Sequence, residues 1–248
     1  MSVAIAVGMG ISGIITTLIG YFWLFLLCSF ISLVGLILIQ TARIPPFKRK
    51  NVSFNFRKMF DFRQLGWNLK VLFLIGFVMS FAFSLLERFA FPIFLREDLK
   101  ADSTFIGVII GFSWLIMAMP AIVWRKMTET HSPVKLYFFG SALTGLLTMC
   151  MSFTPDLFST ICFYILSGFF WGFAGPADWK VLADSANSAD RARDMNLSKM
   201  GHGVGMIIGP MVSGIIADMA GFRYLFVISG ALYLTGALIF LLVIRGYK

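Results

Sequence analysis

Charged residues are scarce in this chain, at 13% of its 248 residues, about half of the share that soluble domains carry. Histidine and cysteine are scarcer, with two histidines and three cysteines, the cysteines at unrelated spacings in apolar segments. The sequence has no Gly-x-Ser-x-Gly element, no Walker-type phosphate loop and no paired acidic metal motif. These absences exclude an ordinary soluble domain and leave no residues on which to base an enzyme, a metal site or a cofactor site.

Apolar residues stand where the charges are missing. They make up 58% of the chain, with a mean hydropathy of +0.86. They gather in eight runs, at about 3–18, 20–42, 69–95, 104–124, 134–153, 157–179, 197–217 and 222–244. Roughly 20 apolar residues cross about 30 Å of hydrocarbon as a helix, and a helix satisfies its own backbone hydrogen bonds there. The sequence therefore predicts an all-α integral membrane protein with about eight transmembrane helices.

The basic residues are distributed unevenly between the predicted loops. If the connection between the second and third runs is cytoplasmic, 17 of the 21 lysines and arginines fall on the cytoplasmic side. This asymmetry is the positive-inside rule. It predicts a multi-pass protein of the cell (inner or plasma) membrane with both termini in the cytoplasm. The net charge of +9 is then a topology signal, and no nucleic acid partner is needed to explain it.

The start of the chain is repeated near its end. Residues 8–39 align without gaps with residues 209–240, and ten of the 32 aligned pairs are identical. Both copies carry a small residue at every fourth position, a pattern that lets membrane helices approach closely. This small-residue ridge comprises Ala4, Gly8, Ser12 and Thr16 in the first copy and Gly201, Gly205, Gly209, Ser213 and Ala217 in the second. Duplicated helix sets are typical of secondary transporters, whose substrate site lies between the repeats.

Several short elements near the C-terminus occur in a characteristic order. They are Ala183-Asp184, Asp190-Arg191-Ala192-Arg193, Gly209-Pro210-Met211-Val212-Ser213-Gly214, Ala217-Asp218 and Gly221-Phe222-Arg223-Tyr224-Leu225-Phe226. This order resembles the major facilitator superfamily, with the Gly-Pro-x-x-x-Gly element in the eleventh helix and a Gly-aromatic-Arg-aromatic turn before the twelfth. The loop at 124–136 matches the family less well, with Glu129 at its acidic position and Lys135 among its basic ones.

The resemblance implies that the chain comprises helices five to twelve of a twelve-helix transporter. Residues 1–42 would be the last two helices of a truncated N-terminal bundle, 43–68 a basic cytoplasmic linker, and 69–248 a complete six-helix C-terminal bundle. The linker either lies on the inner leaflet or simply joins the two bundles. The residues expected to pack helices together are Gly201, Gly205, Gly209, Pro210, Ser213 and Gly214.

Glu87 and Arg88 are ionisable residues inside the third run, one turn before Pro92. Charges within a span are costly and default to a functional interpretation. Gating or substrate contact, an interhelical structural pair, and snorkelling of Arg88 all remain open. Counting 1.5 Å per residue from Leu69 places Glu87 roughly 27 Å along the helix, close to the outer interface. Glu87 is the best candidate for a proton or cation carrier.

Further candidates lie in the other runs. Trp114 and Trp171 would contact substrate in an amphipathic cavity, or would pack against lipid and other helices. Asp178 lies near the cytoplasmic end of its run, where a substrate or coupling role, an inner gate and a plain helix terminus are all open. The other gating candidates are Lys180 and Asp184, which form an i,i+4 pair, together with Glu129 and Arg193.

The sequence supports three functional hypotheses. The first, by resemblance, is ion-coupled secondary active transport of a small solute by alternating access, with drug-like or amphipathic solutes favoured over sugars and organic acids. The second is a truncated or split transporter that is inactive unless a separate polypeptide supplies the missing helices. The third, a membrane receptor or scaffold, rests on the basic segment 43–68 alone. The expected partners are a small-molecule solute, protons and membrane lipids.

Overall fold

The computed structural model of the chain describes residues 2–41, 61–188 and 190–244, and contains no strand among them. Two helices come first, α1 (Ser2–Ile19) and α2 (Tyr21–Thr41). The later elements are η1 (Phe62–Gln64), α4 (Trp67–Leu85), the π-helical turn η2 (Leu86–Ala90), α5 (Phe91–Glu97), α6 (Ser103–Ala118), α7 (Pro120–Thr130), α8 (Pro133–Met151), α9 (Leu157–Ser185), α10 (Arg191–Ala220) and α11 (Phe222–Val243).

Seven stretches of described helix are long and apolar enough to cross a membrane, and α1, whose apolar part is Ala4–Ile19, is a shorter eighth. The predicted all-helical membrane fold is confirmed. Most of the predicted basic linker falls at residues 42–60, outside the described residues.

Several helices run past the apolar segments from which they were predicted. Most of the stretch 124–136, predicted as a loop, is helical because α7 continues to Thr130. The predicted connection 180–196 shortens in the same way, since α9 reaches Ser185 and α10 begins at Arg191. Hydropathy marks where a helix is apolar, and polar residues with good helix propensity carry it further once it leaves the hydrocarbon.

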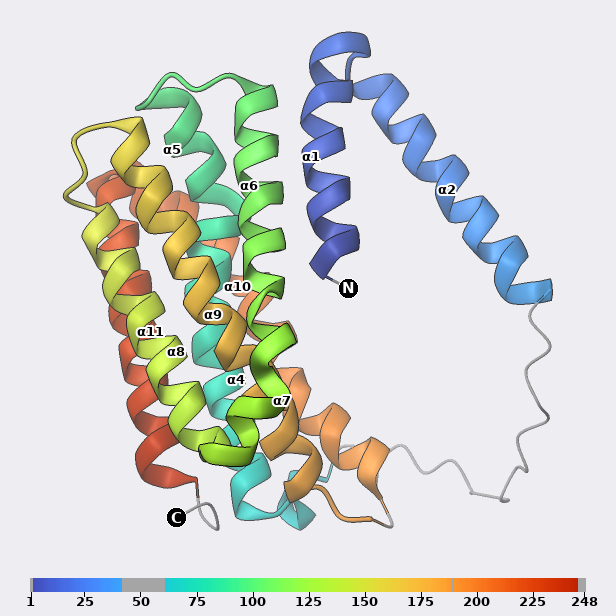
Figure 1. Cartoon of the computed structure of the whole chain (residues 1–248), viewed down its shortest axis with the longest axis vertical. Helices are drawn as coiled ribbons and strands as arrows, with labels where there is room; N and C mark the ends of the chain where they lie inside the picture. Colours follow the sequence, from blue (N-terminus) through green and yellow to red (C-terminus); the bar gives the residue numbers. More distant parts are fainter. Residues whose placement is uncertain (1, 42–60, 189, 245–248) are drawn as a thin grey trace.

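Helices α4 and α8–α11 form a bundle with α6 along one side (Figure 1). We call the end where α4 and α8 begin the lower end, and the end where α9 and α11 begin the upper end. One apolar cluster fills the lower half, where the rings of Tyr137 and Phe240 stack with centroids 3.8 Å apart. Another fills the upper half, where Phe91 stacks on Tyr164 at 4.1 Å.

The small-residue ridge of α10 packs directly along α4. A Cβ atom on Gly205 would lie 2.6 Å from the carbonyl oxygen of Phe77, so the position accepts no side chain without displacement of the backbone. Hydroxyl groups reinforce the contact: Ser84 Oγ donates to the Gly205 carbonyl at 2.9 Å and Ser213 Oγ to the Leu85 carbonyl at 2.6 Å. Such close backbone contact takes the place of a hydrophobic drive between helices in lipid.

The other predicted packing residues divide into two groups. Gly201 and Gly209 lie on the same buried face as Gly205, against Phe73 and Ser84 of α4. Pro210 and Gly214 turn partly away from it, and the nearest atom to a Cβ on Gly214 would be a ring carbon of Phe89 at 3.9 Å.

The two copies of the repeat make the same turn. Gly20 joins α1 to α2 with φ of 85°, and Gly221 joins α10 to α11 with φ of 88°. These positive angles lie in a region that residues with a Cβ rarely adopt, which explains why glycine stands at both aligned positions.

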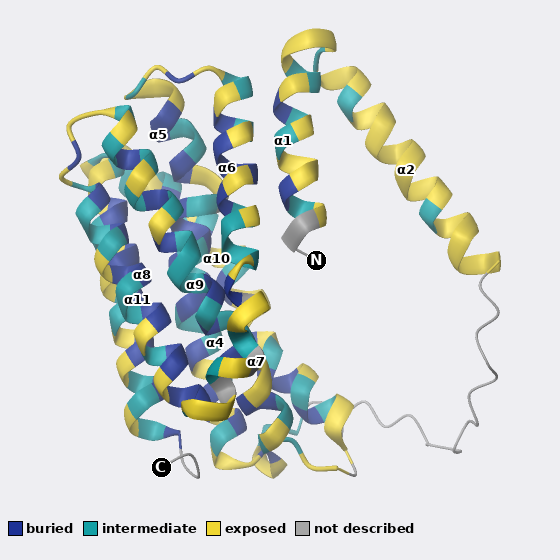
Figure 2. Cartoon of the chain, in the orientation of Figure 1, coloured by how far each residue is buried: buried dark blue, intermediate teal, exposed yellow. Residues whose placement is uncertain are grey.

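The copies differ in what they pack against. Helix α1 contacts α6 through a different face from its predicted ridge, with Gly13 against Gly107 and with Thr104 Oγ1 donating to Thr17 Oγ1 at 2.7 Å. A Cβ added to Gly8 of the predicted ridge would have no atom within 4 Å. Helix α2 extends away from the bundle, and no residue of it is buried (Figure 2). The described helices include no counterpart of α4 against the first-copy ridge, so close packing of that ridge stays a prediction.

Aspartates start two helices at the upper end. Asp102 accepts a hydrogen bond from the backbone N–H of Thr104 at 3.0 Å, and Asp156 accepts one from Ser159 at 2.8 Å. These backbone donors hold the pKa of each carboxyl below its usual value. Both side chains are N-caps that satisfy amide groups left without partners in the first turns of α6 and α9.

The close contact between α4 and α10 predicts that an added methyl group has different effects on stability at two glycines of α10. We expect Gly205→Ala to lower the free energy of unfolding by about 1–3 kcal/mol, because its Cβ meets the α4 backbone. Gly203→Ala is the matched control, since Gly203 has open space around it, and it should be neutral or slightly stabilising. Reversible unfolding in detergent micelles measures both variants. Equal effects would show that α4 and α10 are not in close contact.

Candidate functional site

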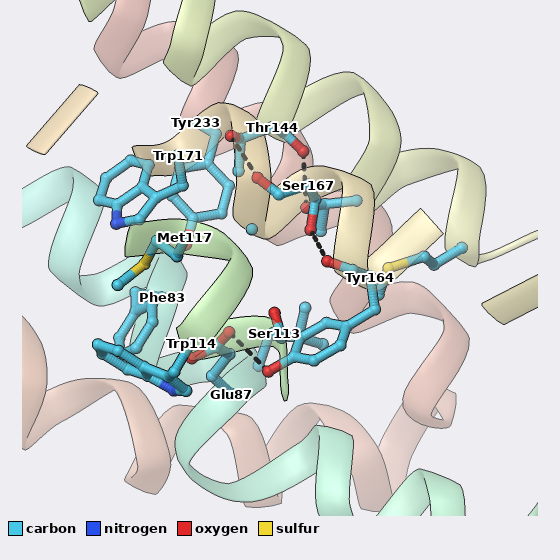
Figure 3. A pocket seen from close by; sticks show the side chains of 14 residues that line it. Phe83, Glu87, Ser113, Trp114, Met117, Thr144, Tyr164, Ser167, Trp171 and Tyr233 are labelled. Carbon is cyan, nitrogen blue, oxygen red and sulfur yellow. Dashed lines mark hydrogen bonds between the residues drawn. The ribbon is translucent and has the colours of Figure 1, made fainter. Parts of the chain in front are cut away.

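A pocket lies between the two apolar clusters, inside the α4–α11 bundle (Figure 3). Its volume is about 30 Å³, enough for a water molecule or two and far below the size of a pocket that encloses a drug-sized ligand. The lining residues are Phe83, Leu86, Glu87, Ser113, Trp114, Met117, Thr144, Thr148, Met151, Tyr164, Ser167, Gly168, Trp171 and Tyr233. They come from α4, η2, α6, α8, α9 and α11, so five packed helices and the π-helical turn build the site.

The π-helical turn positions Glu87 in this pocket. Within the turn the backbone N–H of Phe91 bonds to the Leu86 carbonyl, one residue further back than in an α-helix. Pro92 follows directly and has no N–H to donate to the preceding turn, so the regular ladder cannot continue. The widened turn brings the Glu87 side chain to Tyr164 of α9, whose hydroxyl donates to Glu87 Oε1 at 2.9 Å.

Glu87 lies deeper than the sequence indicated. Counted at about 1.5 Å per residue from the upper ends of their helices, its neighbours Tyr164, Ser113 and Tyr233 lie roughly 10 to 17 Å into the bundle. The helical path that contains Glu87 continues to Glu97, so the upper boundary of the bundle lies well beyond it. The predicted position at the outer interface is therefore wrong, whereas the role of Glu87 stays a prediction.

Hydroxyl groups form the floor of the pocket. Tyr164, Ser167, Thr144 and Thr148 are buried. Ser167 Oγ donates to the Tyr164 carbonyl at 2.8 Å, Thr144 Oγ1 to the Ser167 carbonyl at 3.1 Å, and Thr148 Oγ1 to the Thr144 carbonyl at 2.8 Å. Each hydroxyl has one proton, which these bonds use, so the hydroxyls offer lone pairs to the cavity.

Aromatic rings form the half-buried mouth. Phe83 and Trp114 meet edge to face with centroids 6.3 Å apart, and Trp171 lies 5.4 Å from Tyr233. Figure 3 shows Phe83, Trp114 and Met117 on one side of the cavity and Tyr164 on the other, with Glu87 near the tryptophan.

The structure brings together three of the five predicted substrate or coupling residues. Glu87, Trp114 and Trp171 all line the pocket. Asp178 lies elsewhere, and the side chain of Arg88 is outside the described part of the chain. The buried tyrosines Tyr164 and Tyr233 were not among the predicted site residues. A tyrosine inside an apolar run needs a partner for its hydroxyl, and this was the signal that could have identified them.

Asp178 belongs to a second polar cluster nearer the lower end. It pairs with Lys199 of α10, and the Lys199 ammonium lies 4.5 Å from the centroid of the Trp179 ring. Lys180 and Asp184 form the predicted i,i+4 pair at 3.4 Å. Asp178 and Lys199 side chains are 23% and 27% exposed, against 45% and 47% for Lys180 and Asp184. The Asp178 pair connects two helices, whereas the second stays within α9.

The remaining gating candidates also lie at the lower end. Arg193 donates to Gln64 Oε1 at 3.2 Å and to the Asp61 carbonyl at 3.1 Å, which ties the start of α10 to the segment before α4. Glu129 lies exposed near the end of α7. No cluster of three or more potential metal ligands occurs among residues 2–41, 61–188 and 190–244.

The sequence profile of the Major Facilitator Superfamily matches residues 72–247, which span α4 to α11 and so include the whole pocket. The chain belongs to this superfamily. It is a multi-pass membrane protein, as its apolar helices indicate.

Individual relatives differ in the solutes that their names give. The chain is 22% identical to a probable hexose phosphate transport protein of Chlamydia muridarum, over 68% of this chain and 36% of that protein. It is 26% identical to the multidrug resistance protein MdtG of Proteus mirabilis, over 68% of this chain and 43% of that protein. It is 24% identical to the multi-drug resistance efflux pump PmrA of Streptococcus pneumoniae, over 71% of this chain and 45% of that protein. The chain spans less than half of the length of these relatives.

The two ion pairs of α9 predict unequal effects on stability. We expect Asp178→Asn to lower the free energy of unfolding by about 1–3 kcal/mol, because it leaves the half-buried Lys199 ammonium without its partner. Asp184→Asn should cost less than about 0.5 kcal/mol, since its pair is exposed and lies within one helix. Unfolding in detergent micelles compares the two amide variants. A larger effect at Asp184 would contradict this assignment.

Proposed function

We propose that this protein takes part in secondary active transport of a small solute across the cell membrane by alternating access, driven by an ion gradient. Glu87 carries this proposal: its carboxyl group lines a cavity inside an apolar bundle, on a π-helical turn, with a tyrosine hydroxyl bonded to it. Membership of the superfamily and the names of the relatives support transport.

We infer ion coupling from the free-energy cost of an ionised carboxylate inside the membrane. An ionised carboxylate within hydrocarbon is expensive. The carboxyl group of Glu87 is therefore stable either when it holds a proton or when a positive charge lies beside it. A group with these two alternatives can exchange a proton for a cation, or load a proton at one side of the membrane and release it at the other. We assign the coupling role to Glu87 on this basis.

Alternating access requires the described state to open. The pocket in its present size holds no solute, so the helices around its mouth must separate. At the lower end the contacts Asp178–Lys199 and Arg193–Gln64 link α9, α10 and the segment before α4. We propose that these contacts, together with Lys180, Asp184 and Glu129, form an inner gate at the lower end of the bundle. The lower end would then face the cytoplasm.

We propose the domain division and the choice of solute on similar grounds. Residues 69–248 would act as a six-helix bundle that contains the pocket, and residues 1–42 as two helices of a partner bundle joined by 43–68. The aromatic mouth favours an amphipathic, drug-like solute over a sugar, and relatives named for multidrug resistance support that choice.

Removing the charge of Glu87 tests the coupling role. We expect Glu87→Gln to lower ion-driven solute uptake by about a hundredfold and to abolish its dependence on external pH, because the amide cannot exchange a proton. Uptake into cells that carry the natural protein at its own locus is the measurement. Glu97→Gln is the matched control, since Glu97 is exposed at the end of α5. Unchanged uptake and pH dependence in Glu87→Gln would refute the coupling role.

A second candidate function is that of a transporter part that is inactive until further helices join it. The repeat favours this alternative. Gly209 and Ser213 of the second copy pack against α4, whereas a Cβ on the aligned Gly8 would have no atom within 4 Å, and the hydroxyl of the aligned Ser12 bonds within α1 to the Met9 carbonyl. Likewise Gly236 lies against Met79 of α4, while the aligned Gly35 has nothing near it. A helix equivalent to α4, in a longer form of this chain or in a separate polypeptide, would cover these faces.

Substitutions at two glycines of α1 test this alternative. Gly8→Leu should leave the stability of the 248-residue chain unchanged, because nothing lies near Gly8, yet lower uptake by the natural assembly about tenfold or more through overpacking. Gly13→Leu should impair both, since Gly13 touches the backbone of Gly107. Unfolding of the purified chain and uptake in cells give the two readouts. Normal uptake in Gly8→Leu would show that no helix covers this face.

The intact mass of the natively expressed protein, captured through a C-terminal tag, distinguishes a longer chain from a separate polypeptide.

A further inference from the structure

We propose that the pocket is a binding site for the positively charged group of an organic cation whose aromatic or apolar body lies at the mouth. This assignment rests on the proposed function, because it names the class of solute that the transport site takes. Three independent features of the pocket lining carry it: its charge, the orientation of its hydroxyl groups, and its aromatic rings.

The lining contains an acidic group. Among the side chains that the structure describes around the pocket, Glu87 has the one carboxyl group, and no lysine or arginine is present. Tyr164 holds one of its oxygens in place at 2.9 Å, so the carboxylate has a defined position. A cation beside this group would offset the cost of a charge in the bundle, whereas an anion would add to it.

The floor hydroxyls are also oriented toward a positive charge. Thr148, Thr144 and Ser167 donate their protons to backbone carbonyls, and Tyr164 donates its proton to Glu87. Their remaining capacity is as acceptors. A ligand with N–H donors or a diffuse positive charge can use these lone pairs, while a phosphate, which needs donors, cannot.

Ring faces complete the site at the mouth. Phe83, Trp114 and Trp171 are half-buried there. Aromatic faces attract cations, tryptophan most strongly, and the attraction increases when water is excluded. Because the cavity has room for about one or two water molecules, it accommodates the charged group, and the body of the ligand has to lie against these rings.

This lining distinguishes between the solutes for which the relatives are named. A hexose phosphate is an anion and is bound best by arginine or lysine side chains. The described part of the lining contains no arginine or lysine side chain and offers the Glu87 carboxyl group, hydroxyl groups, two indole N–H groups and ring faces instead. An amphipathic primary amine in its ammonium form matches the carboxyl group, the acceptor oxygens and the rings.

Equilibrium binding of benzylammonium tests the assignment, because its ammonium group is about the size of one water molecule. The full chain is held in lipid nanodiscs, and the labelled cation is measured by equilibrium dialysis. We expect saturable binding that the neutral carbon isostere ethylbenzene and the anion benzylphosphonate do not displace. Glu87→Gln should weaken binding by about tenfold or more, and Trp114→Leu by about threefold to tenfold, as expected for a partly desolvated charge and ring.

Two substitutions away from the pocket serve as controls. Glu97→Gln removes an exposed carboxylate at the end of α5, and Trp23→Leu removes an exposed indole of α2. Both should bind as the natural chain does. Absence of saturable binding, equal displacement by benzylphosphonate, or equal affinity in Glu87→Gln and Glu97→Gln would each overturn the assignment. If Glu87→Gln does not fold, Trp114→Leu and the benzylphosphonate competition on the natural chain decide it.

The binding test separates this inference from the proposed function. Dialysis detects the site at equilibrium and requires no ion gradient. Saturable cation binding without gradient-driven uptake would retain the pocket assignment and refute the proposed coupling. Gradient-driven uptake without cation binding would retain coupled transport and refute the assigned solute class.

Discussion

Direct contact between helix backbones is the interaction on which this protein depends. Lipid surrounds the helices with apolar groups, so burying apolar side chains gives little drive for association, and packing has to supply it. The structure meets this need with glycines at the crossings: Gly205 against α4, Gly145 against Gly230 between α8 and α11, and Gly13 against Gly107 between α1 and α6. Hydroxyl groups such as those of Ser84 and Ser213 then bond across the crossing to backbone carbonyls.

The pocket occurs where this close packing is interrupted. The large side chains of Tyr164, Trp171 and Tyr233 lie at the centre of the bundle, and the π-helical turn at Leu86–Ala90 interrupts the regular helix that begins with α4. π-Helical turns are rare and often mark functional sites. Here the turn directs an acidic side chain into the bundle, and the surrounding hydroxyl groups and rings give that side chain an electron-rich cavity.

The two copies of the repeat share a residue pattern but pack against different helices. Both copies make the same turn at a glycine with positive φ, Gly20 and Gly221. The second copy buries its ridge against α4, whereas the first copy contacts α6 through Gly13 and leaves Gly8 open. Identical small residues thus permit close contact on a face, and the neighbouring helices decide whether that contact is made.

The class of the protein could be predicted from local patterns in the chain. Apolar runs and the repeat indicate a helical membrane bundle, because helix length and small-residue spacing are local properties. The Gly-Pro-x-x-x-Gly and Gly-Phe-Arg-Tyr elements add a resemblance to the major facilitator superfamily. Glu87, Trp114 and Trp171 were predictable as site candidates, since charges and indoles are conspicuous in apolar runs.

Other features emerged only when the helices were packed together. They include the bond from Tyr164 to Glu87, the pairing of Asp178 with Lys199 outside the pocket, and the face of α1 that meets α6. These contacts depend on the rotation of each helix about its axis and on partners 77 and 21 residues away along the chain. Neither the helix rotations nor the distant partners can be predicted from hydropathy and residue spacing, because each of these patterns describes a single segment.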